Sequence, residues 1–427
     1  MDMTMSQPQT AVRAPISSRV TQIRTAAGIE VWLVEDHARP LLCVRFGFRR
    51  AVKAVRSEIP GAGAVMAKSL IEGAGDMNDE AFRLALSEAA IDLGVALQFD
   101  HLHGSMQCLS RDAPRAFQLL TLALTKPRFA EDVIERQRTM LRAALSNQMR
   151  NPVRLALDHF MSTAFGTHSY GIGNDEVHDR LATLKRSDVI DAHEQMLTRA
   201  NAVVVVVGNI GVATLTRAIE DAFGLLPSGT AVEVAPCTMQ NLGQTVTRHM
   251  ATPQTGLIFG RHCISADDPD FAAAQVVARA FGGGDFGSRL FTELRENRNL
   301  CYSIAMQIEM AAGLCCLIGL TSTPNDKAGE ARDAIQSEIA RLLDRGLTAE
   351  EIDDARTYLV GADKMARVSS SALAGALFSL QLRKKTPDWI HTAIANIDKV
   401  TPEDVARVIP RMFGDGALLF SIADPTP

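Results

Sequence analysis

Two stretches of this chain, roughly 214 residues apart, follow the same layout (184–208 and 398–423). Each begins with a hydroxyl residue, Ser187 or Thr401, that precedes acidic residues, a pattern typical of the first turn of a helix. A helical segment, a polar turn and a strongly apolar segment then follow in both, and the first apolar segment contains a run of valines at 203–207. This repeat predicts two similar halves, each closing with a helix and a buried strand.

A second pair of segments, 127–135 and 345–353, supports the repeat, because each opens a long helical pattern. Strand patterns are mixed with helical ones without a regular strand–helix–strand alternation, which favours α+β sandwiches. We expect early strands in the following ranges: 30–34, 42–48, 94–99, 104–109 and 255–259.

A segment rich in proline, glycine and serine separates the two halves and is predicted to be a linker. The predicted division is an N-terminal extension (1–20), a first domain (21–225), the linker (226–240) and a second domain (241–427).

Composition excludes several classes of function. The net charge of −5 and an aromatic content of only 5% argue against a nucleic-acid-binding protein. No apolar run is long enough to span a bilayer, and the first residues lack the basic start and apolar core of a secretory signal. We therefore expect a cytoplasmic protein, or a periplasmic one if a signal was removed before residue 1. The seven cysteines have no C-x-x-C spacing and are expected to be free thiols.

Residues 60–74 read P-G-A-G-A-V-M-A-K-S-L-I-E-G-A. This segment resembles P-G-x-A-H-F-L-E-H-M-L-F-x-G-T of the M16 family of zinc peptidases, which includes pitrilysin, insulinase and processing peptidase. In that motif two histidines at i and i+4 bind zinc and a glutamate between them acts as the base. The resemblance places the histidine positions on Ala64 and Lys68 and the glutamate position on Ala67. None of these side chains can take over the role, because alanine has no lone pair and a charged ammonium cannot donate one.

The third zinc ligand of the family lies in a downstream helix of the type F-x-x-x-x-F-E-R-E-K-x-x-V-L-E-E-I. Here residues 129–145 read F-A-E-D-V-I-E-R-Q-R-T-M-L-R-A-A-L, and the glutamate pair falls on Ala143 and Ala144. Either segment alone also fits an ordinary amphipathic helix. Loss of the chemical groups at both places indicates an inactive homologue that keeps the fold.

Residues 281–304 read F-G-G-G-D-F-G-S-R-L-F-T-E-L-R-E-N-R-N-L-C-Y-S-I. They are similar to the family motif G-G-G-x-x-S-R-L-F-x-E-L-R-E-x-R-G-L-A-Y-S, with Asn299 and Cys301 in place of glycine and alanine. The resemblance implies a glycine-rich loop (Gly282, Gly283 and Gly284) and a pair that grips substrate peptide, Arg295 and Tyr302. The alternative is architectural, with Arg295 paired to Glu293 or Glu296 and Tyr302 capping a core strand.

Three further motifs resemble nucleotide-binding or metal-binding sites only weakly. The glycines at 282–287 fit G-x-G-x-x-G, but a helical pattern precedes them where a dinucleotide fold needs a strand. His193 and Glu194 begin H-E-x-x-H, but position 197 is leucine. His101 and His103 share one strand face without an evident third ligand, so a surface pair is the preferred interpretation.

The resemblance covers nearly the whole chain and implies two homologous α+β halves arranged as a clam. It also implies a role as the non-catalytic, substrate-binding subunit of a heterodimeric M16B peptidase. Such a chain binds no metal or cofactor itself, and zinc is expected in a partner with an intact H-x-x-E-H. The alternatives are a structural core-type subunit of a larger complex and a metal-independent peptide-binding homodimer.

Overall fold

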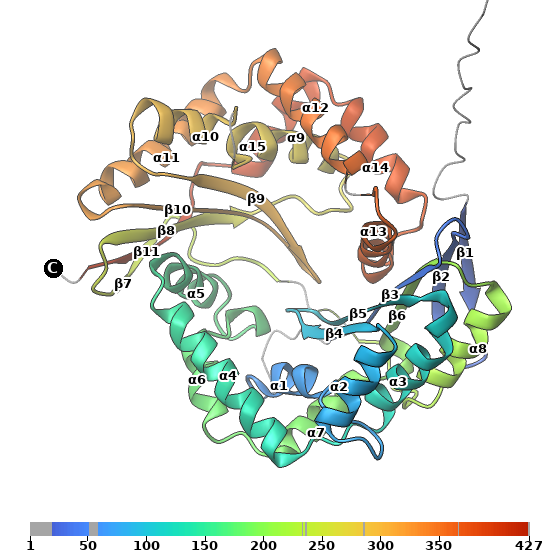
Figure 1. The fold of residues 1–427 in the computed structure, drawn as a ribbon. Coiled ribbons are helices and arrows are strands. Elements are labelled where there is room, and N and C mark those ends of the chain that lie inside the picture. The colour runs from blue at the N-terminus through green and yellow to red at the C-terminus, as the bar shows by residue number, and fades with distance from the viewer. Residues whose placement is uncertain are drawn as a thin grey trace, which may run out of the picture.

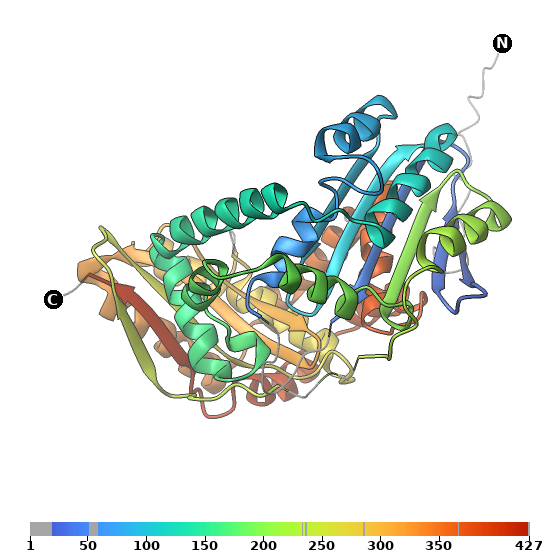
Figure 2. The same cartoon turned by 90° about the horizontal axis from the view of Figure 1, so that it is seen from below.

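The structure is a computed structural model that describes residues 19–50, 59–232, 234, 237–284, 287–365 and 367–425. Residues 1–18 of the predicted extension, and residues 233, 235 and 236 of the predicted linker, lie outside this description. The chain forms two β-sheets, each with helices packed against it (Figure 1 and Figure 2). None of the helices in the described ranges is both long and apolar enough to cross a membrane.

The first sheet has six strands in the order β1-β2-β6-β3-β5-β4. Its strands are β1 (Val20–Arg24), β2 (Glu30–Glu35), β3 (Leu41–Arg49), β4 (Asp92–Leu97), β5 (His101–Leu109) and β6 (Ala202–Gly208). The valine run lies in β6, and every residue of this strand is buried because both faces of the sheet are covered there. The strands expected at 30–34, 42–48, 94–99 and 104–109 are therefore confirmed to within a few residues.

The described part of the first half contains eight α-helices. They are α1 (Ala62–Ser69), α2 (Asp79–Glu88), α3 (Ala113–Thr125), α4 (Glu131–Met149), α5 (Pro152–Phe165), α6 (Asn174–Leu181), α7 (Arg186–Met196) and α8 (Val212–Phe223). One face of the sheet forms the main core with α1, α2, α3 and α8, and Phe46, Phe48 and Phe223 meet there ring against ring.

The second sheet has five strands in the order β7-β11-β8-β10-β9. They are β7 (Thr245–His249), β8 (Gln254–His262), β9 (Ile304–Ala311), β10 (Leu314–Pro324) and β11 (Leu419–Asp424). The helices are α9 (Phe271–Gly282), α10 (Arg289–Phe291), α11 (Ala328–Arg345), α12 (Ala349–Met365), α13 (Ser370–Leu382), α14 (Trp389–Asp398) and α15 (Pro402–Phe413). A π-helical turn at Thr292–Asn297 continues α10.

The predicted repeat is confirmed by the pairing of the closing strands. β6 follows α7 and lies between β2, to which it is parallel, and β3, to which it is antiparallel. β11 follows α15 and lies in the same way between β7 and β8. Thr401 caps α15 as predicted, but Ser187 does not cap α7. That helix begins one residue earlier, at Arg186, and Asp188 instead accepts the backbone N–H of Lys185.

The two halves exchange a helix. α5 from the first half covers β8 and β11 of the second sheet, whereas α13 from the second half covers β6 and β3 of the first (Figure 1). The contacts are tight: a Cβ at Gly260 would lie 2.9 Å from Phe160, and one at Gly47 would lie 2.7 Å from Phe378. Each half therefore completes the core of the other, and neither sheet is covered on both faces by its own half.

This exchange also corrects the interpretation of His101 and His103 as a surface pair. Both rings pack against Phe378 of α13, with centroids 5.9 Å and 5.4 Å from its ring. Burial lowers the pKa of His103. The imidazoles are therefore part of the contact between the halves.

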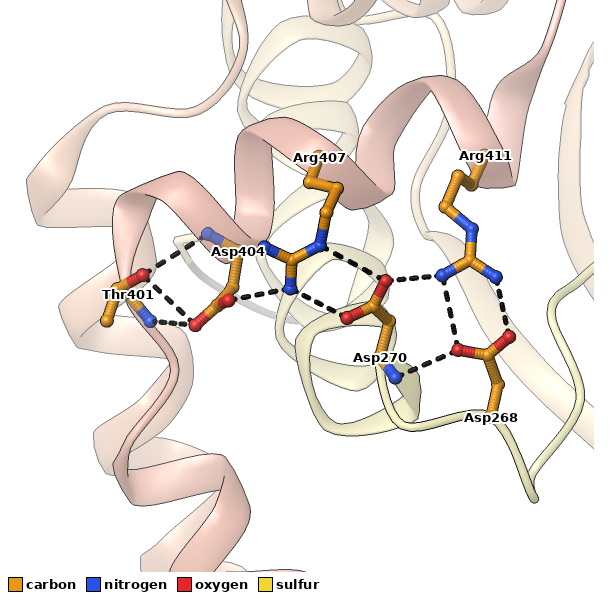
Figure 3. Close-up of polar contacts among 6 residues, drawn as sticks. All are labelled: Asp268, Asp270, Thr401, Asp404, Arg407 and Arg411. Atoms are coloured by element: carbon orange, nitrogen blue, oxygen red, sulfur yellow. Dashed lines mark hydrogen bonds and ion pairs between the residues drawn. The ribbon is translucent and has the colours of Figure 1, made fainter.

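An ion-pair network joins the start of α9 to α15 (Figure 3). Asp270 binds both Arg407 and Arg411, Asp268 binds Arg411, and Asp404 binds Arg407 while capping the helix together with Thr401. The guanidinium of Arg407 lowers the pKa of Asp270, and that of Arg411 lowers the pKa of Asp268. The network holds a loop against the last helix of the chain.

These shifts predict a loss of stability in acid. A carboxyl group with a lowered pKa in the folded state stabilises the fold above its unfolded value of about 3.9, and this contribution disappears as the pH falls through the folded pKa. We expect the unfolding free energy to decline below about pH 5, and to decline less in Asp270→Asn. Urea titrations between pH 7 and pH 3 would measure this. Asp344→Asn is the control, since Asp344 is 76% exposed in its ion pair. Equal acid sensitivity of Asp270→Asn and the unmodified chain would contradict the prediction.

Candidate functional site

α1 carries the two positions that the family resemblance assigns to the first two zinc ligands. Gly61 precedes the helix with φ of 89°, and a Cβ there would come within 2.9 Å of Leu181. Glycine is therefore required for the turn into α1 on both conformational and steric grounds. Ala64 and Lys68 lie one turn apart on the same helix face, where Ala64 is half-buried and Lys68 is exposed.

Ala67, at the position of the catalytic base, is completely buried in the main core of the first half. A helix with alanine, lysine and buried alanine at these positions offers no lone pair to a metal and no carboxylate to a water molecule. α1 therefore lacks the chemical groups of the metallopeptidase helix that its sequence resembles.

α4 crosses α1 and carries the position of the third ligand. Ala143 and Ala144 are both exposed, but their side chains are methyl groups and cannot bind a metal. Among the residues that the structure describes, no group of three or more His, Cys, Asp or Glu side chains could hold a metal ion. Zinc does not fit the residues present at the α1–α4 crossing.

What remains of the polar chemistry near this crossing is an ion pair network. Arg136 of α4 binds Glu72, just after α1, and Asp79 at the start of α2, both at 2.9 Å. Side-chain hydrogen bonds to Glu72 and Asp79 raise the pKa of Arg136. Arg136 matches the arginine of the family's downstream motif, and here it ties α1, α2 and α4 together.

Gly282 is the last residue of α9, Gly283 and Gly284 follow it, and Gly282 and Gly284 lie close to β9. A Cβ at Gly282 would lie 2.5 Å from the Cβ of Met306 in β9, and Gly284 has φ of 84°. The carbonyl of Gly283 accepts a hydrogen bond from Arg279 at 2.9 Å. The glycines are thus needed for close approach to β9 and for the turn.

Arg289 and Arg295 belong to the same short motif but have different surroundings. The Arg289 side chain is 9% exposed and binds Glu351 of α12 through two hydrogen bonds of 2.8 Å and 2.6 Å. Arg289 also donates to the carbonyl of Gly346 at 2.9 Å. This first arginine is therefore an internal anchor that fixes α10 to α12.

Arg295 lies on the π-helical turn beside Tyr302. Its guanidinium is 5.0 Å from the ring centroid of Tyr302 and 4.7 Å from that of Phe291. Such distances allow cation–π attraction. Tyr302 is 82% exposed, so it does not cap a core strand. Glu293 binds Arg298 and Asn297 at 2.7 Å and 3.0 Å.

Three residues around the glycine-rich segment and Arg295 were not singled out from the sequence: Phe291, Arg279 and Tyr358. Phe291 lies under the guanidinium of Arg295, one helical turn before it. Arg279 holds the carbonyl of Gly283 and stacks on Tyr358 of α12, with its guanidinium carbon 3.6 Å from the ring centroid. The spacing of four residues between Arg279 and Gly283 at the end of a helix was the one available hint.

Comparisons with known proteins agree with this geometry. Residues 183–359 match the family model described as "Peptidase M16 inactive domain". The non-peptidase homolog YmxG of Helicobacter pylori is 21% identical over 93% of this chain and 92% of its own length. These matches support an inactive member of the M16 peptidase family. A relative named as an uncharacterized zinc protease, from Streptomyces coelicolor, is 25% identical over 72% of this chain and 68% of its own length.

The fold of this chain is similar to that of solved structures. A crystal structure described as a peptidase M16 inactive domain from Pseudomonas fluorescens superposes with a TM-score of 0.88 at 23% identity. The superposition covers 96% of this chain and 98% of that one. At this identity the likeness establishes the fold, and the two-sheet α+β architecture predicted from the sequence is thereby confirmed.

Proposed function

We propose that the chain is the non-catalytic, substrate-binding subunit of a heterodimeric M16B zinc peptidase that acts on peptides or precursor peptides. The observation that carries this proposal is a contrast between the halves. The first half has alanines and a lysine at the ligand and base positions, whereas the second half presents Arg295 and Tyr302 together, with the tyrosine ring and hydroxyl facing solvent.

Arg295 and Tyr302 have the chemistry to hold a peptide backbone. A guanidinium offers five N–H donors in a fixed plane, and a phenol offers one further donor, so together they can bind carbonyl oxygens of an extended peptide. Phe291 supports the guanidinium from one side and limits its motion. Donors fixed in this way also stabilise negative charge that develops on a carbonyl oxygen during hydrolysis.

The partner supplies the chemistry that this chain lacks. Zinc held by the partner's H-x-x-E-H helix provides Lewis-acid polarisation and an activated water. In this proposal the second half of the present chain faces that site and adds Arg295 and Tyr302 to it, while Gly282, Gly283 and Gly284 border the peptide path. We retain the cytoplasm as the proposed location of the complex.

The test is to assay peptide cleavage by this chain, by an H-x-x-E-H homologue from the same organism, and by the mixture. We expect this chain alone to contain far less than one zinc and to be inactive, and the mixture to cleave in a chelator-sensitive manner. Elemental analysis and size-exclusion chromatography of the same samples give the metal content and the dimer fraction. Chelator-sensitive cleavage by the purified chain alone, or full activity of the homologue alone, would refute the proposal.

A further inference from the structure

Two cysteines lie opposite each other where β8 ends and β10 begins. The ladder pairs His262 with Cys316, and one step further the N–H of Cys263 donates to the carbonyl of Cys315 at 2.9 Å. Residues opposed in this way have Cα atoms about 5.5 Å apart and side chains on the same face of the sheet. Disulfides need a Cα separation of about 4.4–6.8 Å, so this pair meets the requirement without movement of the backbone.

The two thiols already contact each other. Their side chains share a hydrogen bond, which lowers the pKa of Cys315 despite its burial, and the cation of Arg383 acts in the same direction. The same bond, together with burial, raises the pKa of Cys263. Of the two, Cys315 is the one that favours the thiolate and Cys263 the one that stays a thiol. Both side chains are half-buried.

None of the other five cysteines has a lowered pKa. Burial raises the pKa of Cys43, Cys301 and Cys316. It also raises the pKa of Cys108 and of Cys237 to about 11. Because the thiolate is the reactive form, these side chains are expected to react more slowly with oxidants.

We propose that Cys263 and Cys315 form a reversible disulfide and that this pair is a site of oxidation by peroxides. The Cys315 thiolate attacks one peroxide oxygen, the O–O bond breaks, and hydroxide leaves and takes up a proton to become water. Cys263 then attacks the sulfur of the sulfenic acid, and a second water leaves with the thiol proton. Two thiols are oxidised to one disulfide, and one hydrogen peroxide is reduced to two waters.

The bond would fasten the segment that follows β8 to the start of β10. That segment leads to Asp268 and Asp270, which bind α15 through the network of Figure 3. A disulfide between Cys263 and Cys315 closes a loop and restricts the unfolded chain. The Tm of the oxidised protein should therefore be higher than that of the reduced protein. This inference does not depend on the proposed peptidase role.

The test treats the reduced full-length protein with hydrogen peroxide, blocks the remaining thiols and digests with trypsin. Cys263 lies in peptide 262–279, and Cys301, Cys315 and Cys316 share peptide 299–327. We expect these two peptides to become cross-linked, the free thiols to fall from seven to five, and dithiothreitol to reverse both changes.

Variants assign the bond within peptide 299–327. The cross-link should persist in Cys316→Ser and in Cys301→Ser, and it should disappear in Cys315→Ser and in Cys263→Ser. Tm of the oxidised and reduced forms of each variant should differ only where the cross-link persists. A cross-link that survives Cys315→Ser, or a wild-type chain that loses other thiols first, would overturn the proposal.

Discussion

Replacing Arg295 with alanine, or Tyr302 with phenylalanine, is expected to lower kcat/KM of the assembled peptidase by about 10²–10³-fold, the usual effect of removing one donor to a developing oxyanion. The two substitutions remove different chemical groups. Arg295→Ala removes the guanidinium, whereas Tyr302→Phe removes only the hydroxyl and keeps the ring that lies 5.0 Å from that guanidinium. Tyr302→Phe should not unfold the chain, because Tyr302 is exposed and its ring is retained.

Arg298→Ala is the matched control for these variants. Arg298 lies on the same turn, its side chain is 40% exposed, and it binds Glu293. If any loss of positive charge near the site slowed the reaction, Arg298→Ala would be as slow as Arg295→Ala. We expect Arg298→Ala to stay near the wild-type rate. The dimer fraction, Tm and kcat/KM should be measured on the same samples. Wild-type turnover per folded dimer in both Arg295→Ala and Tyr302→Phe would show that the pair is architectural.

The repeat made the two-sheet fold predictable, because a helix followed by a strand such as 203–207 recurs at a fixed distance in the chain. The exchange of α5 and α13 was not predictable in this way. An amphipathic helix pattern shows that one face is buried, but not which sheet buries it, and α13 turns its apolar residues toward Val203 and Val205 of the other half. The same limit explains why His101 and His103 were taken for surface residues.

At the site, residue identity predicted which groups are missing but not how the remaining ones are placed. Ala64, Lys68 and the alanine pair on α4 exclude zinc ligation by chemistry alone. Arg289 and Arg295, by contrast, are six residues apart in one motif and carry the same charge. Only the structure separates them, because Glu351 comes from a helix some sixty residues further along and binds Arg289. Gly282, which the resemblance placed in a glycine-rich loop, is the last residue of α9, and the close approach of Gly282 and Gly284 to Met306 and Ala305 of β9 could not be read from the motif.

Arg289→Ala is expected to destabilise the chain by about 3–5 kcal/mol, the effect of breaking a buried ion pair from one side. The change leaves the Glu351 carboxylate without the two hydrogen bonds it accepts from Arg289, and it leaves the carbonyl of Gly346 without its donor. Glu351 keeps the N–H of Thr348 at 2.7 Å, which compensates only one of its oxygens. Urea titration of the unfolding free energy measures the loss.

Two further variants separate the ion pair from general loss of charge. Arg345→Ala removes an arginine whose ion pair with Asp344 is 75% and 76% exposed, so we expect a change below about 1 kcal/mol. The double variant Arg289→Met with Glu351→Leu removes both charges and should be more stable than Arg289→Ala, because no carboxylate is left unpaired. A loss in Arg289→Ala no larger than that in Arg345→Ala would mean that α10 is held by packing of Leu290 and Phe291. The position of Arg295, which follows on the same turn, would then not depend on the anchor at Arg289.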